Sequence, residues 1–197
     1  MNKKIFKFFL VFFLIFQTES FATNPSDFVQ SAVNRASEIL KQNISKEEKM
    51  EKIELIAEEV VDIKGIAYYT LGSYRKELND EQMQQYLTLF EKYFLKTFTS
   101  RLTDYSEPKI DVVSAEVKNP KYTIVKSVLL ATDKKPAVNI EWRVYTKNPD
   151  KPLIRDLIIE GLSLARAEKE QFDSVIQSNN GNVIKLFDVL KEFVAKQ

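Results

Sequence analysis

The residue types that most enzymes use for catalysis are missing from this sequence. It contains no histidine and no cysteine among its 197 residues. Their absence excludes Ser-His-Asp and Cys-His catalysis, histidine-bound zinc and histidine acid–base chemistry. Only carboxylate, lysine, tyrosine or serine–lysine chemistry remains. The sequence therefore argues against most enzyme classes and favours a protein that is not an enzyme.

Charged residues near the end of the chain could be mistaken for a catalytic group. Glu160 lies among apolar residues, but no second carboxylate or base stands at a suitable spacing, so we interpret it as a paired or surface carboxylate. Other charged residues alternate with apolar ones in predicted strands: Glu141, Arg143, Arg155 and Asp156. This alternation is typical of a solvated strand face or of cross-strand pairs. The four glycines are scattered and form no phosphate-binding loop.

An excess of aromatic residues is the feature that most clearly suggests binding. Tyr and Phe residues crowd two consecutive predicted helices: Tyr68, Tyr69, Tyr74, Tyr86, Phe90, Tyr93, Phe94, Phe98 and Tyr105. These rings either fill the core between the helices and a sheet or line an apolar cavity there. Periodicity does not separate the two interpretations, because a filled core and a lipid pocket need the same residue types.

The first 22 residues predict a secretory signal peptide. Three lysines within residues 1–7 precede the uninterrupted apolar run Phe8–Phe16, and Ser20-Phe21-Ala22 provides small residues at a cleavage site. The apolar run is shorter than the ~18–20 residues that span a bilayer, and no cysteine follows it to carry a lipoprotein anchor. We therefore expect residues 1–22 to be removed and residues 23–197 to form a single domain in the periplasm.

The predicted mature chain is nearly neutral. The full sequence has 29 Lys and Arg against 28 Asp and Glu, and removal of Lys3, Lys4, Lys7 and Glu19 leaves 26 against 27. Such a balance shows no nucleic-acid signature and no basic run for membrane docking. Without cysteine the domain must also fold without a disulfide, on its apolar core alone.

Hydrophobic periodicity predicts helices first, then strands, then helices again. Helical spacing begins near Asn24, Ser45, Asp62 and Asn79, and the fourth and longest helix reaches Leu102. Period-two segments follow at 110–117, 122–131, 138–146 and 153–164, before helices at 165–178 and 183–194. Short connections favour antiparallel neighbours, and one apolar strand face requires a cover. We predict an α+β fold, with an antiparallel sheet of four or more strands covered on its apolar face by helices.

An ordered set of short motifs resembles the MlaC family, also called the toluene-tolerance family. Leu-Gly-Ser-Tyr at 71–74 precedes Asn-Asp-Glu-Gln at 79–82 and a long aromatic helix. Glu-Trp-Arg at 141–143 and the segment 155–163 match the family's W-R/K and D-x-x-x-E-G-x-S patterns, and Gln171-Phe172 and Asn180-Gly181 continue the match. The resemblance spans residues 27–193. Arg75 departs from it, because an aromatic residue is common there.

The resemblance implies a fold and a function. MlaC-like proteins have an NTF2-like sheet, and phospholipid acyl chains enter between this sheet and the helices while the headgroup stays near the surface. They exchange lipid with an inner-membrane ABC transporter through its MCE-domain subunit and with an outer-membrane lipoprotein–porin complex. The phospholipid is then cargo, no cofactor is needed, and a monomer suits a shuttle.

Helical spacing and strand alternation predict which side chains would contact the lipid. On the helical wall we expect Tyr68, Leu71, Tyr86, Phe90, Phe94 and Phe98. On the sheet wall we expect Val128, Ile140, Trp142, Val144, Leu157 and Ile159. An error of one residue in register would move the side chains of a whole strand to the opposite face.

Three other functions remain open at the level of sequence. The cargo could be another apolar lipid, such as a hopanoid-like molecule, because apolar walls carry little headgroup information. An NTF2-like enzyme would need a buried carboxylate or tyrosine with a strongly shifted pKa in its cavity. A non-lipid periplasmic adaptor would have a solid core and a protein partner.

Overall fold

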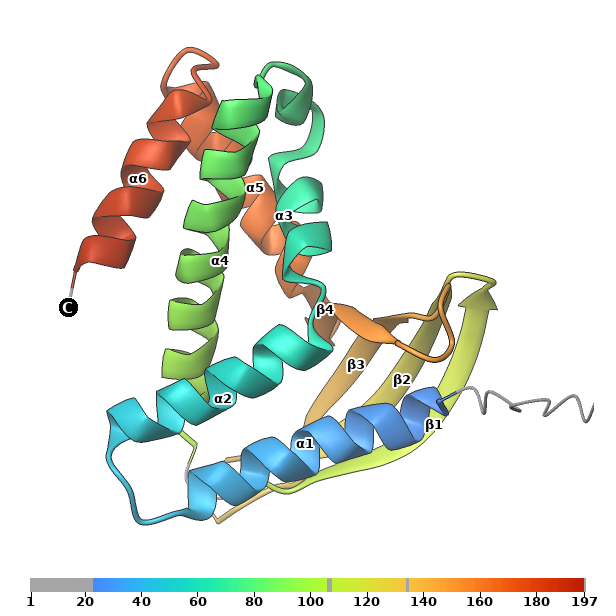
Figure 1. Ribbon diagram of the computed structural model, residues 1–197. Coiled ribbons are helices and arrows are strands. Elements are labelled where there is room, and N and C mark those ends of the chain that lie inside the picture. Colours follow the sequence, from blue (N-terminus) through green and yellow to red (C-terminus); the bar gives the residue numbers. More distant parts are fainter. Residues whose placement is uncertain (1–22, 106–107, 134, 197) are drawn as a thin grey trace, which may run out of the picture.

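Along the described part of the chain, helices come first, the strands of the sheet follow, and two more helices end it (Figure 1). The computed structural model describes residues 23–105, 108–133 and 135–196. The helices are α1 (Pro25–Lys41), α2 (Lys46–Val60), α3 (Ile63–Leu71), the 3-10 turn η1 (Gly72–Lys76), α4 (Asp80–Leu102), α5 (Leu164–Ser178) and α6 (Ile184–Ala195). The strands are β1 (Ile110–Asn119), β2 (Tyr122–Leu129), β3 (Val138–Tyr145), β4 (Leu153–Ile159) and β5 (Leu162–Ser163).

The strands form one open antiparallel sheet in the order β1-β2-β3-β4-β5. The predicted α+β fold with four or more antiparallel strands is confirmed. The prediction of one continuous strand over 153–164 is wrong, because the chain reverses at Glu160 and Gly161. Both residues have positive φ, 48° and 83°, which is the backbone of a tight two-residue hairpin turn.

Side-chain caps place the helix starts where the sequence predicts them. Ser45 and Glu48 form a capping box at the start of α2, and Asn79 and Gln82 form another at the start of α4. Each pair satisfies two backbone N–H groups that the first helical turn leaves without a partner. Asn24 caps α1 by accepting a hydrogen bond from the Ser26 N–H. These starts are local properties of the chain.

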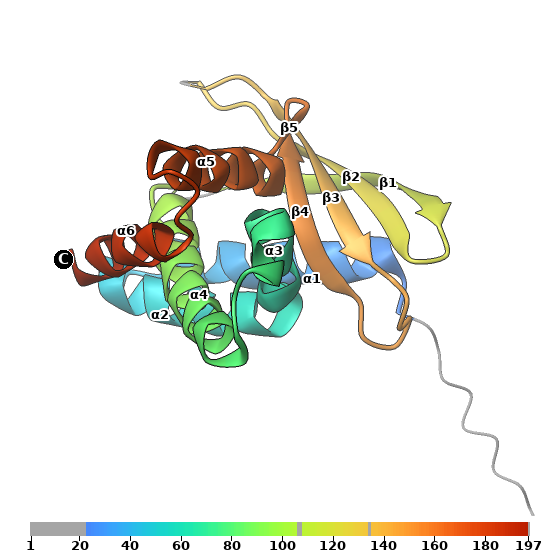
Figure 2. The ribbon, with the colours of Figure 1, turned by 90° about the horizontal axis from the view of Figure 1, so that it is seen from above.

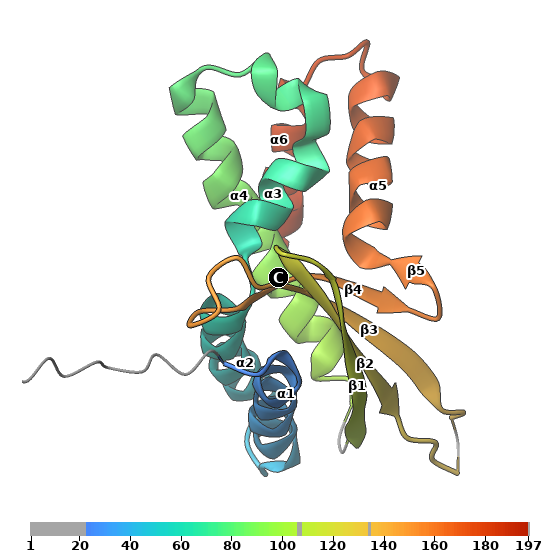
Figure 3. The same cartoon turned by 90° about the vertical axis from the view of Figure 1, so that its right-hand side faces the viewer.

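The helices divide into two groups around the sheet (Figure 3). Helix α1 packs on β1 and β2 and lies beside α2, whereas α3 and α5 pack against β4, toward the opposite edge of the sheet. Helix α4 packs against α2, α3 and α6. We call the sheet face under α1 the inner face and the opposite face the outer face.

Two apolar clusters form the core. The larger one joins α2 through α6 and includes the fully buried side chains of Tyr86, Phe90 and Phe187. The smaller one joins α1 to the sheet through Val29, Val33, Val125 and Val144. Trp142 and Phe28 pack against both clusters and so connect the helical group to the sheet.

The junction between α2 and α3 is attached to β4. The Asp62 N–H donates to the Ile154 carbonyl at 2.9 Å. The Asp62 carboxylate caps α3 by accepting from the Gly65 N–H at 2.9 Å and pairs with Arg155 Nε at 2.6 Å. A Cβ atom at Gly65 would lie 2.4 Å from Asp62 Oδ2. Only glycine at this position leaves room for the carboxylate that connects the helices to the sheet.

The predicted signal peptide, residues 1–22, lies outside the described residues. Within the described part of the chain, no helix combines the length and the apolar character needed to cross a membrane.

Candidate functional site

Five of the six predicted sheet-wall residues share the inner face. Ile140 pairs with Ile159 and Trp142 pairs with Leu157, while Val144 lies further along the same face of β3. Val144 is fully buried under α1 and Ile140 is 8% exposed. Trp142, Leu157 and Ile159 stay partly exposed to solvent. The inner face therefore changes from a closed core under α1 to a solvent-accessible apolar surface toward β4.

Val128 does not belong to this wall. Its cross-strand neighbour in β3 is Asn139, and Ser127 is the β2 residue opposite Ile140. The prediction that Val128 and Ile140 share a face is wrong, because β2 is one residue out of the assumed register. The segment 122–129 has apolar residues on both faces, so alternation alone could not fix its orientation.

Ser127 is a residue of this wall that sequence reasoning missed. The Trp142 indole N–H donates to Ser127 Oγ at 2.8 Å, and the Ser127 hydroxyl is directed at the Ile140 carbonyl at 3.4 Å. Ser127 is only 2% exposed. The bond satisfies the polar end of the indole and holds its ring among apolar neighbours. In the sequence Ser127 is only a small hydroxyl residue in an apolar strand. Its role as an acceptor follows only from the pairing of β2 with β3, which brings Trp142 close to it.

The predicted residues of α4 form a continuous ladder of rings. Tyr86, Phe90, Phe94 and Phe98 are spaced four apart and therefore lie along one side of the helix. Phe90 and Phe94 are 6.2 Å apart between ring centroids, and Phe94 and Phe98 are 5.5 Å apart. Tyr86 and Phe90 are 0% and 1% exposed, whereas Phe94 and Phe98 are partly exposed. The ladder thus runs from a filled core to a surface that solvent can reach.

The remaining helical-wall residues lie in α3. Leu71 is 1% exposed and belongs to the larger cluster, so it is a core residue of the helical group. Tyr86 is fixed there too, because its hydroxyl lies 2.9 Å from Thr70 Oγ1 and donates to the Ala67 carbonyl at 3.2 Å. Tyr68 is partly exposed, and the Lys64 ammonium lies 6.0 Å from its ring centroid.

The partly exposed members of both walls border the same apolar cluster. Phe94 and Phe98 of α4 pack against its buried residues, as do Trp142 and Leu157 of the sheet. Apolar side chains that stay accessible on both sides of one cluster are the arrangement that a two-sided apolar binding site requires. We define Phe94, Phe98, Trp142, Leu157 and Ile159 as the candidate site.

Two hollows that the described residues form lie away from the candidate site. One of about 370 Å³ runs along the exposed side of α1, and one of about 170 Å³ lies between α3 and α4. None of the twelve predicted residues lines either hollow. The lipid cavity between the helices and the sheet stays a prediction.

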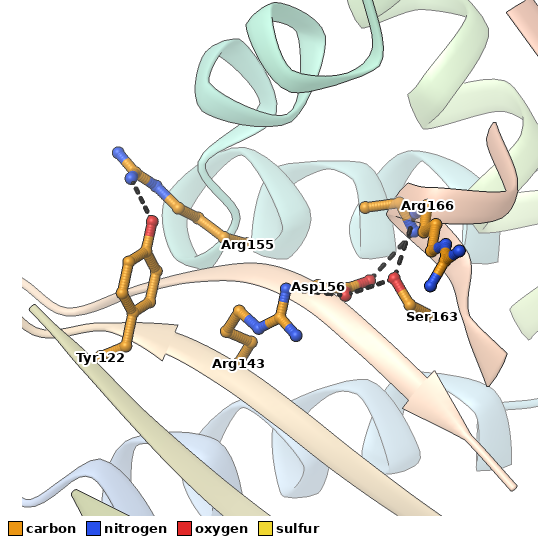
Figure 4. A network of polar contacts seen from close by, with 7 residues as sticks. Tyr122, Arg143, Arg155, Asp156, Ser163 and Arg166 are labelled. Carbon is orange, nitrogen blue, oxygen red and sulfur yellow. Dashed lines mark hydrogen bonds and ion pairs between the residues drawn. The ribbon is translucent and has the colours of Figure 1, made fainter. Parts of the chain in front are cut away.

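The charged motif at residues 155–163 is a structural joint, by which we mean a set of polar contacts that attaches one element of the fold to another (Figure 4). Asp156 is 4% exposed and accepts from the Ser163 hydroxyl at 2.6 Å and from the Ala165 N–H at 3.0 Å. Arg143 lies opposite Asp156 in the sheet and 3.4 Å from the same carboxylate, so of the two predicted alternatives, a solvated face or cross-strand pairs, these two residues fit the second. Glu160 accepts a hydrogen bond from the Asn139 N–H at 2.5 Å, which agrees with a paired carboxylate. These contacts fasten α5 to the end of β4.

The Leu-Gly-Ser-Tyr motif is a second joint. Gly72 ends α3 with a φ of 59°, a conformation that glycine adopts most easily. The Tyr74 hydroxyl then donates to Asp173 at 3.0 Å and accepts from Gln177, which ties η1 to α5. Both motifs therefore position helices around the core, through hydrogen bonds to other parts of the protein.

A half-buried carboxylate binds Tyr93 of α4. Glu168 of α5 accepts a hydrogen bond from the Tyr93 hydroxyl of α4 at 2.8 Å. Burial raises the pKa of the Glu168 carboxyl above its usual value, against the opposing effects of the Tyr93 hydrogen bond and the Arg101 charge. Burial also raises the pKa of Tyr93, and the neighbouring Glu168 adds to this effect. The pair joins α4 to α5.

The raised pKa of Glu168 predicts a pH dependence of stability. A folded-state pKa above the unfolded value means that the folded protein holds this proton more tightly. The stability contribution is then present below the unfolded pKa of about 4.5 and is lost as the pH rises through the folded pKa. Relative to Glu168→Gln, the wild type should lose free energy of unfolding between about pH 4.5 and pH 7. Urea unfolding of both proteins across this range tests this, and a constant difference would contradict it.

Comparisons with known proteins agree with the fold. A family model described as "MlaC protein" matches residues 30–192. No curated protein shows significant sequence similarity to this chain. A solved structure of a phospholipid-binding protein from Ralstonia solanacearum, in complex with a phospholipid, superimposes with a TM-score of 0.74. The two sequences are 21% identical, and the match covers 88% of this chain and 98% of the other. The structural match shows that both chains share one fold.

Proposed function

The chain belongs to the MlaC family, and we propose that it is a phospholipid carrier that shelters acyl chains at the candidate site without catalysing a reaction. The observation that carries this proposal is the pair of partly exposed apolar walls, Phe94 and Phe98 on one side and Trp142, Leu157 and Ile159 on the other. The Ralstonia solanacearum protein of the same fold was solved with a phospholipid bound, which supports the same ligand class here.

The energetics of lipid transfer explain why such a carrier needs apolar walls. Each buried methylene contributes about 0.8 kcal/mol, so two acyl chains of roughly 30 methylenes represent on the order of 24 kcal/mol of gross burial. A phospholipid therefore does not cross an aqueous compartment unaided. A protein that covers the chains needs apolar surface and a route of entry, and the lipid can then pass to whichever partner binds it more tightly.

We place the route of entry between α4 and the inner face. Helix α4 packs mainly against α2, α3 and α6, while α1, α3 and α5 hold the sheet. Acyl chains that enter there would displace side-chain contacts and leave the backbone hydrogen bonds of the sheet intact. The ring ladder would supply one wall, and Trp142, fixed by Ser127, would supply the other.

The proposal includes a location and partners. We propose export through residues 1–22 and action in the periplasm as a monomer. The expected donors and acceptors of lipid are the MCE-domain subunit of an inner-membrane ABC transporter and an outer-membrane lipoprotein–porin complex. Family membership supports this scheme.

Native mass spectrometry of protein purified from a bacterial periplasm, with extraction and identification of bound molecules, tests the proposal. A phospholipid at near-stoichiometric occupancy is the expected result. A hopanoid-like molecule would retain the carrier function and correct the cargo. A ligand-free mass that does not change after incubation with phospholipid vesicles would contradict the proposal and favour the adaptor.

A matched pair of substitutions tests which sheet face binds lipid. Ile140→Trp enlarges a side chain on the inner face, so it should reduce phospholipid occupancy severalfold by filling space that the acyl chains need. Val128→Trp makes a similar change on the outer face and should leave occupancy unchanged. Native mass spectrometry of both variants gives the ratio. Unchanged occupancy in a folded Ile140→Trp protein, or equal loss in both variants with intact circular dichroism spectra, would contradict the assignment of lipid binding to the inner face.

A further inference from the structure

A groove with an apolar floor lies between α3 and α4, apart from the candidate site. Its volume is about 170 Å³. Apolar groups line its floor and polar groups its rim: Ile63, Ala67 and Leu87, then Lys64, Gln84, Thr88 and Glu91. Helices α2, α3 and α4 lie in one group beside the sheet (Figure 2). Helix α2 packs against α4, and Glu91 on the groove rim interacts electrostatically with Glu54 of α2, which links the groove to that helix.

Carboxylates continue from this groove along α2. Glu51, Glu54 and Glu58 are spaced three and four residues apart, so they share one flank of the helix. Glu54 interacts electrostatically with Glu51, Glu58 and also Glu91 of α4, so the charges of both helices form one group. Burial first, and then these neighbouring carboxylates, raise the pKa of Glu54.

Within the described residues, none of these four carboxylates has a salt-bridge partner. Two other charges of α2 are in ion pairs, since Glu59 binds Arg35 at 2.6 Å and Lys46 binds Asp104 at 3.0 Å. Lys64 on the groove rim faces the Tyr68 ring instead. Like charges at helical spacing repel, so the free surface would gain from a cationic partner.

An exposed apolar side chain accompanies the charges. Leu55 is 66% exposed and lies between Glu51 and Glu58 in the sequence of α2. A single exposed leucine is ordinary on a protein surface. Here it follows Glu51 by four residues and precedes Glu58 by three, so it shares their side of α2 and offers apolar contact beside the charges.

We propose that this surface, which we call the acidic groove (Leu55, Glu51, Glu54, Glu58, Glu91 and the hollow between α3 and α4), docks a basic, amphipathic segment of a protein partner. Lysine or arginine side chains of that segment would pair with the carboxylates while an apolar side chain covers Leu55 or enters the groove. None of the residues of the candidate site belongs to the acidic groove, so the proposal is independent of lipid binding.

The charge distribution favours a basic segment over other ligands. The predicted mature chain is nearly neutral overall, so the acidic groove is a local feature and not a general acidity. Among the residues that the structure describes, no group of acidic side chains has a geometry suited to a metal ion. Complementary charge at such a rim mainly accelerates association and sets specificity, and added salt weakens it.

Fluorescence anisotropy with a labelled helical peptide of leucine and lysine tests the docking surface. A peptide of the same length with glutamate in place of lysine is the control probe. The lysine peptide should bind the wild type and weaken as NaCl rises from about 20 to about 200 mM. The variant Glu51→Gln, Glu54→Gln, Glu58→Gln, Glu91→Gln should bind at least about tenfold more weakly, and Leu55→Ser should weaken binding severalfold.

A charge-matched variant makes the test specific. Glu38→Gln, Glu77→Gln, Asp133→Asn and Glu192→Gln remove the same charge at exposed positions elsewhere, and this protein should bind like the wild type. Neutralising the acidic groove removes repulsion, so that variant should stay folded and keep its bound lipid. Equal binding by both fourfold variants, or no binding to the wild type at low salt, would overturn the proposal.

Discussion

Replacing Leu157 by glutamate is expected to lower phospholipid occupancy at least about tenfold, which corresponds to about 1.4 kcal/mol. Leu157 lies on the inner face opposite Trp142 and is partly exposed beside the larger apolar cluster. A carboxylate there would have to be buried next to hydrocarbon, and burial of an unpaired charge is strongly unfavourable. The free protein tolerates it better, because water reaches this position.

Leu162→Glu is the matched control for this result. Leu162 lies in β5, just beyond the hairpin turn, and is 61% exposed. The same change of side chain there should leave lipid occupancy unchanged. Native mass spectrometry after exposure to phospholipid vesicles measures both variants, and circular dichroism confirms folding. Leu157→Gln, which adds no charge, provides a second folded variant. Full occupancy in both Leu157 variants would exclude this residue from the acyl-chain site.

Asp156→Ala is expected to destabilise the fold by about 2 to 4 kcal/mol. The carboxylate accepts hydrogen bonds from the Ser163 hydroxyl and the Ala165 N–H, and it is 4% exposed. Alanine would leave the buried Ala165 N–H without an acceptor at the start of α5. The effect should reach beyond α5, because that helix also packs against α3 and α6.

Urea unfolding measures this loss, and two variants separate its causes. Asp156→Asn keeps the shape and one acceptor and should lose less stability than alanine. Arg143→Gln removes only the ion pair, whose arginine side chain is 42% exposed, and should cost less than about 1 kcal/mol. If Arg143→Gln were as damaging as Asp156→Ala, the ion pair and not the hydrogen bonds would hold this joint.

The two predictions distinguish positions that hold the fold from positions that meet the ligand. The polar motifs by which the sequence resembles the MlaC family, including Gly72, Tyr74 and Asp156, join helices to one another and to the sheet. The candidate site consists of ordinary apolar side chains. The recognisable sequence features of this chain therefore lie in the contacts between its helices and its sheet, because apolar walls need only size and hydrophobicity.

The sequence by itself determined much of the local structure and the class of fold. Capping boxes at Ser45 and Asn79 define helix starts through contacts three residues apart, so these starts were predictable. The change from helical to period-two spacing after Pro108 predicted the α+β class. The lack of histidine and cysteine excluded most catalytic chemistry without any structure.

The tertiary structure alone decided which predicted residues meet. Val128 lies on the outer face because its position depends on pairing with Asn139 in another strand, and the local sequence of β2 is apolar on both faces. Tyr86 and Phe90 are core residues while Phe94 and Phe98 stay accessible, although all four share the same spacing. Helical periodicity fixes only the side on which a ring lies. Its exposure depends on which distant element packs there, and that is set by long-range contacts between segments.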